Sequence, residues 1–108
     1  MKNYLVISLL ILSVGFSQRL SEVIETYDNG NIKSITYHKK TRNGIEKIKE
    51  EIYHENGQKE GEGTFKDGKL EGLVTGWYEN GQKNSEQLFK DGNFISLKEW
   101  NEDGSVKE

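Results

Sequence analysis

The chain contains no cysteine among its 108 residues. This absence excludes a disulfide framework, and it also excludes a lipid-modified N-terminal cysteine. Histidine is scarce, with only His38 and His54. No His-Glu-x-x-His pattern or cysteine set is present, so the sequence predicts neither a metal site nor a cofactor.

Clustered positive charge is also missing. The 15 Lys and Arg residues are interspersed with 18 Asp and Glu residues, for a net charge of −3. Phosphate binding needs clustered cations, so we do not expect a nucleic-acid partner. Apolar residues make up only 32% of the chain, a composition typical of disorder. The regular recurrence of aromatic residues argues for a folded chain instead.

Residues 1–17 have the composition of a secretory signal peptide. Lys2 precedes an apolar run from Tyr4 to Leu12, and small residues follow it. The pattern predicts a helical leader, cleavage after Ser17, and export to the periplasm, the cell surface or the medium. The alternative is an uncleaved anchor, although the run is shorter than the span of about 20 residues that a bilayer requires.

One stretch, from Tyr53 to Lys59, organises the rest of the chain, and it returns at residues 78–83. Each copy contains Asn-Gly, a strong hairpin signal because both residues accept the positive φ of tight primed turns. Eleven residues after each of these glycines comes an Asp-Gly signal, and equivalent glycines are 24 residues apart. The predicted turn residues are Asn56, Gly57, Asn80, Gly81, Asp67, Gly68, Asp91 and Gly92.

A fixed period indicates a repeat architecture. We predict an all-β fold over residues 25–108: an elongated single-layer antiparallel meander of tandem β-hairpins. Residues 18–24 are interpreted as a linker or an edge segment. Ile45, Ile48 and Ile52 have helical spacing. We nevertheless predict a strand there, because the segment aligns without a gap with residues 69–76.

Aromatic residues recur in two columns. Because side chains alternate along a strand, both columns can lie on one face of the sheet. Gly61 and Gly63 would leave room there for rings on the facing strand. The columns are interpreted as a structural stripe, with a binding platform as the alternative. Their members are Tyr53, Trp77 and Trp100, four residues before turn glycines, and Phe65 and Phe89, eight residues after them.

The segments from Tyr78 to Gly92 and from Tyr53 to Gly72 resemble the bacterial variant of the MORN repeat. The resemblance extends over about residues 25–108, with a degenerate first repeat and a truncated last one. It implies scaffolds and interaction modules, linked in some relatives to membrane association, lipid contact or dimerisation. Many bacterial members carry an antitoxin-like label, so an inhibitor of a partner protein is an alternative function.

Carboxylates provide the only catalytic alternative. Glu60 and Glu62 are predicted to share a strand face, and Glu86 repeats Glu62 in the next unit. A glycosidase needs two carboxylates across a sugar, but pairing with Lys59 and Lys83 explains this column more simply. We therefore predict a non-catalytic, exported interaction module whose partner is another protein. Membrane contact is a weaker alternative, and the oligomeric state stays open.

Overall fold

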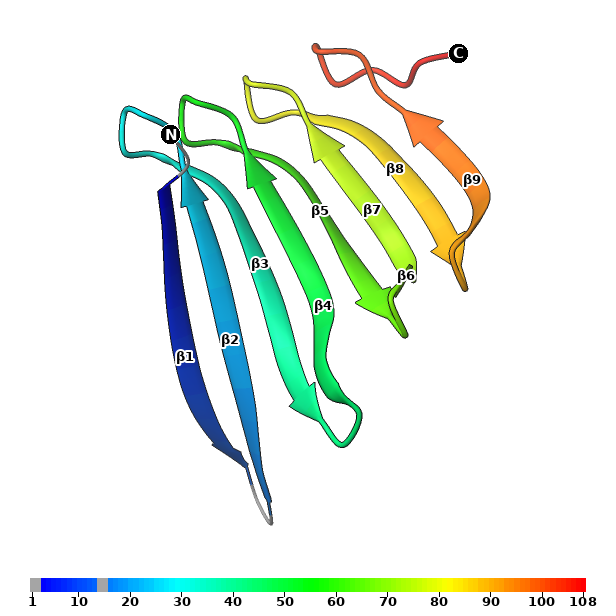
Figure 1. The fold of residues 1–108 in the computed structure, drawn as a ribbon. Helices are drawn as coiled ribbons and strands as arrows, with labels where there is room; N and C mark the ends of the chain where they lie inside the picture. Colours follow the sequence, from blue (N-terminus) through cyan, green and yellow to red (C-terminus); the bar gives the residue numbers. More distant parts are fainter. Residues whose placement is uncertain (1–2, 14–15) are drawn as a thin grey trace.

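The computed structural model describes the backbone of residues 3–13 and 16–108 and the side chains of residues 3–4 and 21–108. The described residues form one antiparallel sheet in which consecutive strands are neighbours, in the order β1-β2-β3-β4-β5-β7-β8-β9, while β6 pairs with the end of β5 (Figure 1). The strands are β1 (Asn3–Ser13), β2 (Phe16–Thr26), β3 (Ile32–Thr41), β4 (Gly44–Tyr53), β5 (Lys59–Lys66), β6 (Lys69–Leu70), β7 (Gly72–Trp77), β8 (Lys83–Lys90) and β9 (Asn93–Glu99).

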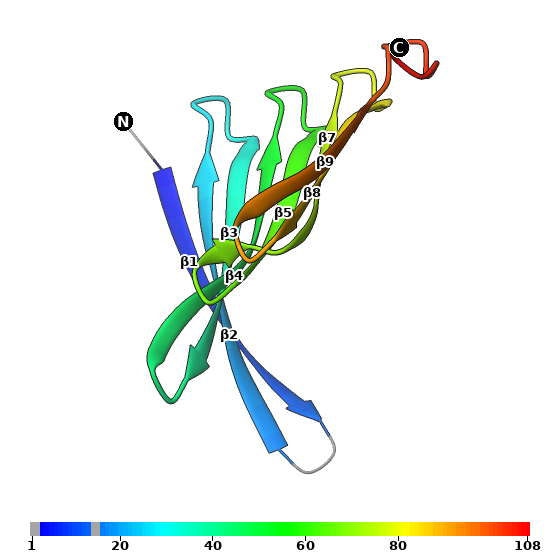
Figure 2. The same cartoon turned by 90° about the vertical axis from the view of Figure 1, so that its right-hand side faces the viewer.

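The sheet is one twisted layer with no second layer on either side among the described residues (Figure 2). Its radius of gyration is 16.0 Å, against about 13 Å for a compact chain of this length. Ile35 is the only buried apolar residue in the described part, and Glu51 is buried beside it on the neighbouring strand. The expectation of an elongated, single-layer meander is confirmed, with a smaller core than one apolar sheet face would give.

Turn chemistry explains why the chain reverses at regular intervals. Gly57 has a φ of 92° and donates its N–H to the carbonyl of His54, whose own N–H bonds to Gln58. The same turn forms at Gly30, Gly81 and Gly104. Here only the glycine has positive φ, so these are not the primed turns that we expected.

The primed turns occur at the opposite ends of the strands. Asp67 and Gly68 have φ values of 52° and 78°, and Asp91 and Gly92 have values of 51° and 82°. Positive φ at both central residues is the requirement of the tightest two-residue hairpin loop. Each repeat therefore uses two turn types, one at each end of its strands.

A one-residue bulge follows the Asn-Gly turn in three hairpins. Tyr53 pairs with Lys59 and Ile52 pairs with Gly61, so Glu60 is the extra residue. Lys33 and Asn84 are the extra residues in the equivalent positions of their hairpins. A bulge interrupts the alternation of side chains, so parity counted from the turn gives the wrong face for the residues beyond it.

Because of this bulge, the two aromatic columns lie on opposite faces of the sheet, and the prediction that they share a face is wrong. We call the face that carries Gly61, Gly76 and Phe65 the cleft face, and the face that carries Lys59 and Trp77 the lysine face. A Cβ on Gly61 would meet the Ile52 side chain at 3.3 Å, and one on Gly63 would meet Val74 at 3.2 Å. These glycines make room for aliphatic neighbours, not for rings.

The isoleucine-containing segment is strand β4, as predicted. Its pairing with β3 shifts by one residue between Tyr37 and His38, which leaves Ile48 as the extra residue. Because of this bulge, Ile45 and Ile52 can return to the same face although they are seven positions apart. The helical spacing was the sequence signature of a bulge.

The helix expected in the leader is not observed. Residues 3–13 form β1, which pairs along its whole length with β2. The run is rich in Val, Ile and Leu, and β-branched residues favour strands when a neighbouring strand offers pairing. Residues 18–24 lie within β2, between β1 and β3. The leader prediction also includes residues 1–2 and 14–15, which lie outside the described residues.

Candidate binding surface

A ladder of side-chain hydrogen bonds ties each hairpin to the next. Tyr27 donates its hydroxyl to the carbonyl of Tyr53 at 2.6 Å, and Tyr78 donates to the carbonyl of Trp100 at 2.8 Å. His54 occupies the equivalent position, with Nε2 2.9 Å from the carbonyl of Trp77. A carbonyl only accepts, so Nε2 carries the proton. His54 thus takes the place in its hairpin that Tyr27 and Tyr78 have in theirs.

A second ladder runs along the turns. The side-chain amide of Asn56 donates to the carbonyl of Glu79 in the next turn at 3.1 Å, and Asn80 donates to Glu102 at 2.9 Å. The other atom of each amide accepts the N–H two residues on, from Gln58 in the first case. Both ends of each asparagine side chain are thus used, which a turn former such as glycine could not reproduce.

The predicted stripe of Tyr53, Trp77 and Trp100 lies on the lysine face, but the rings do not contact one another. Lys59, which is paired with Tyr53, has its Nζ 5.8 Å from the ring centroid of Trp77. Lys83, which is paired with Trp77, lies 5.4 Å from the ring centroid of Trp100. Lysines therefore lie beside the rings of the stripe, and each contact contributes cation–π attraction of about 0.5–1 kcal/mol at exposed sites.

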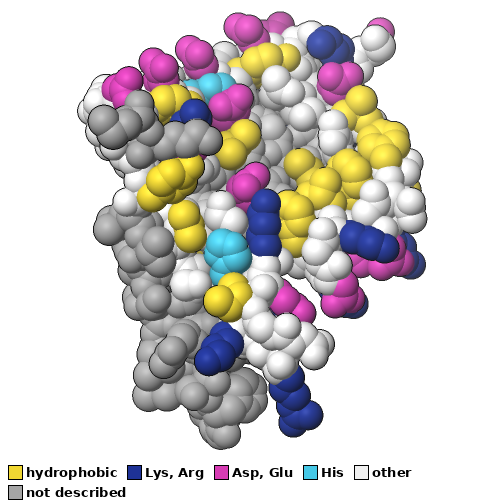
Figure 3. Space-filling view, viewed as in Figure 1, with side chains coloured by type: hydrophobic (Ala, Val, Ile, Leu, Met, Phe, Trp, Pro, Cys, Tyr) yellow, Lys and Arg dark blue, Asp and Glu magenta, His cyan; other side chains and the backbone are white. Residues whose placement is uncertain are grey.

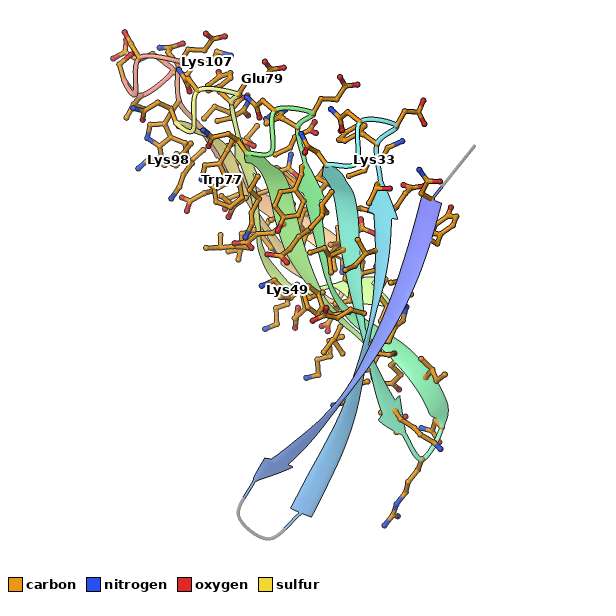
Figure 4. All side chains as sticks on the ribbon, turned by 90° about the vertical axis from the view of Figure 1, so that its left-hand side faces the viewer. Lys33, Lys49, Trp77, Glu79, Lys98 and Lys107 are labelled. Carbon is orange, nitrogen blue, oxygen red and sulfur yellow. The ribbon has the colours of Figure 1, made fainter. Side chains whose placement is uncertain are left out.

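Figure 4 shows that Lys49, Trp77 and Lys98 project from the same side of the sheet, while Glu79 lies at the turn edge. The lysines on this face are largely neutralised. Lys59 lies 3.0 Å from Glu62, and Lys83 lies 3.1 Å from Glu86. The predicted partners of Glu62 and Glu86 are confirmed, but each pair lies within one strand, three residues apart, and not across strands as we predicted.

Glu51 is the centre of a buried polar network on the lysine face. Its side chain is 8% exposed, its Oε2 lies 2.6 Å from Lys59 Nζ, and its Oε1 accepts the hydroxyl of Tyr37 at 2.6 Å. Burial alone raises the pKa of Glu51, but the hydrogen bonds from Lys59 and Tyr37 outweigh burial and hold that pKa below its ordinary value. The hydrogen bond with Glu51 also raises the pKa of Lys59.

The cleft face is hollowed between the second hairpin (β4–β5) and the third (β7–β8), where the cleft has a volume of about 710 Å³. Gly61 and Gly76 are directly paired on β5 and β7 and form its floor without side chains. His54, Glu60, Tyr78 and Ser85 are among the residues around it. The cleft is thus present because two paired glycines leave its floor without side chains.

Glu60 and Glu62 do not share a face, contrary to prediction. Glu62 bonds to Lys59 on the lysine face. Glu60, the bulge residue, lines the cleft, and its Oε2 lies 3.8 Å from His54 Nδ1. Two carboxylates on opposite faces cannot flank one sugar, so a Glu60–Glu62 pair does not form a glycosidase site. No three His, Cys, Asp or Glu residues cluster as metal ligands in the described chain.

The second aromatic column lies on the cleft face. Lys47 Nζ covers the ring of Phe65 at 4.3 Å from its centroid, and Phe89 packs edge to face on Phe94 at 5.9 Å. Exposed apolar residues gather over β8 and β9 beyond the cleft (Figure 3). On β9 they are Phe94, Ile95 and Leu97. Among the described residues, no helix is long and apolar enough to cross a membrane.

Sequence reasoning missed two features of this surface. Glu51 and Tyr37 were not singled out, because no repeat shows the pair: residue 75, one period after Glu51, is Thr75. The bulge residues were also missed. The signal that could have found them is the glycine period, since Lys33, Glu60 and Asn84 each follow a turn glycine by three positions.

Two segments of the chain match a known family model. Residues 43–67 and 70–91 match the family model described as the MORN repeat variant. The matched segments contain the second and third hairpins, on which the cleft lies. No curated protein and no solved structure matches the chain.

Proposed function

From the two MORN repeat variant segments, we propose that this protein is an exported, non-catalytic module that binds another protein. MORN repeats are in general modules for contact with proteins or membranes, and they are in general non-catalytic. The observation that carries the proposal is the cleft across two matched hairpins, because a concave site with a few polar groups is the usual place for a bound ligand, here a segment of another protein.

The architecture suits a scaffold. Each hairpin is tied to the next by a Tyr or His bond and an Asn bond. Such ladders fix the spacing of the side chains that a partner meets, and fixed spacing lowers the entropy lost on binding. Export rests on the composition of residues 1–17.

Subcellular fractionation with N-terminal sequencing of the native protein tests export. We expect the protein outside the cytoplasm with Gln18 as its first residue. Recovery only from the cytoplasm with Met1 retained would refute export.

Crosslinking in cells, followed by capture and identification, tests binding. We expect a protein partner that is lost when Gly76→Val fills the cleft, and retained in Gly63→Ala, which lies outside it. Capture that is equal for both variants, with both folded by circular dichroism, would contradict a role for the cleft.

A further inference from the structure

The bulge gives each hairpin one redirected side chain at the same place. Lys33, Glu60 and Asn84 are a cation, an anion and an amide, whereas the Asn-Gly turn before each of them is unchanged. Bulges are frequent next to binding sites because they re-aim a side chain. The turn residues are the same in each hairpin, as a structural role requires. The bulge residue differs from one hairpin to the next, as a role in recognition allows.

The cleft also continues beyond the glycine floor. A second hollow of about 310 Å³ lies over β3 and β4 and contains Lys33. Ile52 and Glu60 line both hollows, so the two adjoin each other across the strands, and together they are called the groove. Adjacent hairpins are two strand spacings apart, about 9.5 Å, which is close to three residues of an extended peptide.

Glu60 is the one bulge residue that faces both hollows, and it has no strong partner. Its side chain is 46% exposed, and the only basic side chain within 4 Å of its carboxylate among the described residues is the imidazole of His54, at 3.8 Å. Glu62 and Glu86, by contrast, are each paired with a lysine at about 3 Å. Glu79 and Glu102 also line the larger hollow, and no lysine or arginine does. The smaller hollow contains one cation, Lys33, together with Glu25, Glu50 and Glu60.

We propose that this groove holds an extended segment of a protein partner, lying across the strands, and that Glu60 receives a lysine or arginine side chain of that segment. The inference rests on the proposed function as a protein-binding module. The commitment to a basic side chain comes from charge complementarity, since a carboxylate in a groove without a lysine or arginine partner favours an ammonium or guanidinium group. Ile52 and Val74 supply apolar contact beside it.

The test uses small probes and the glycine amides of the protein. N-acetyl-arginine methylamide is titrated while the backbone amide signals are followed by NMR. We expect saturable shifts at Gly61 and Gly76, on the floor, and none at Gly68 and Gly92, at the far edge. The matching glutamate derivative should produce no saturable shift.

Two variants complete the test. Glu60→Gln should weaken binding of the arginine probe about tenfold, because a charge-assisted hydrogen bond becomes a neutral one. Glu86→Gln, on the lysine face, should leave binding unchanged. An absent or non-saturable shift, an equal response to the glutamate probe, or equal binding by Glu60→Gln would overturn the proposal.

Failure of the groove assignment is distinguishable from failure of the proposed function. A protein partner that crosslinks equally to the wild type and to folded Glu60→Gln would overturn the role of Glu60 and leave the binding module intact. Absence of any protein partner from the wild type would instead refute the proposed function.

Discussion

Replacement of Glu51 by glutamine tests the electrostatic centre of the sheet. The carboxylate accepts two short hydrogen bonds, from Tyr37 and from Lys59, both at 2.6 Å. Hydrogen bonds to a charged group contribute about 1.5–3 kcal/mol, and neutral ones about 0.5–1.5 kcal/mol. Glutamine has one acceptor oxygen, which can still take the bond from Lys59, and an NH2 group that can only donate, so the Tyr37 hydroxyl must turn to accept from it. Without the negative charge each bond weakens by about 1 kcal/mol, and the variant should lose about 2 kcal/mol.

Thermal and urea unfolding, followed by circular dichroism, measure this loss. For a domain of this size, about 2 kcal/mol corresponds to a fall of about 8 °C in Tm. Glu86→Gln is the matched control: its pair with Lys83 is partly exposed and should change stability by less than about 1 kcal/mol. If Glu51→Gln is no less stable than Glu86→Gln, the reasoning is refuted, since buried ion pairs can contribute little net stability.

The same network predicts a pH dependence. The pKa of Glu51 is lower in the folded state than in the unfolded state, so the folded state binds fewer protons in the acid range. The stability that the ionised Glu51 contributes is complete above the ordinary carboxyl pKa of about 4.3, and it is lost as pH falls through the pKa of the folded state. The difference in stability between wild type and Glu51→Gln should therefore be constant from about pH 6 to 8 and shrink below about pH 4.3. A difference that grows on acidification would contradict this sign.

Three further substitutions address the ladder and the turns, each measured by urea unfolding. His54→Tyr restores the residue found at Tyr27 and Tyr78 and should stabilise the protein by about 0.5–1 kcal/mol; a loss of stability would show that the ring is not interchangeable. Tyr78→Phe removes the donor to Trp100 and should cost about 1 kcal/mol, and an unchanged midpoint would mean that water replaces the hydroxyl. Gly81→Ala forces a side chain into a φ of 88° and should cost about 1–2 kcal/mol; tolerance of alanine would indicate a turn that can rearrange.

The hairpins could be predicted because turn chemistry is local. Asn-Gly and Asp-Gly at a fixed 24-residue period place every reversal of the second and third repeats. The face of each side chain could not be predicted by counting, because Glu60 and Asn84 are inserted as bulges and reverse the parity beyond them. The cleft depends on the pairing of Gly61 with Gly76, which requires the correct register.

The conformation of residues 3–13 and the buried network could not be predicted, for different reasons. An apolar run without clear periodicity is compatible with a helix or a strand, and pairing with β2 decides the outcome for residues 3–13. Glu51 is one of many glutamates, and its burial beside Ile35 depends on the pairing of β3 with β4. No local pattern distinguishes it from its exposed neighbours.

The bonds between hairpins link residues 22 to 26 positions apart, and each joins one unit only to the next. An inserted copy of residues 57–80 would therefore find ready-made partners on both sides and extend the molecule by about 9.5 Å. The length of the sheet therefore depends on how many copies of this segment the gene contains.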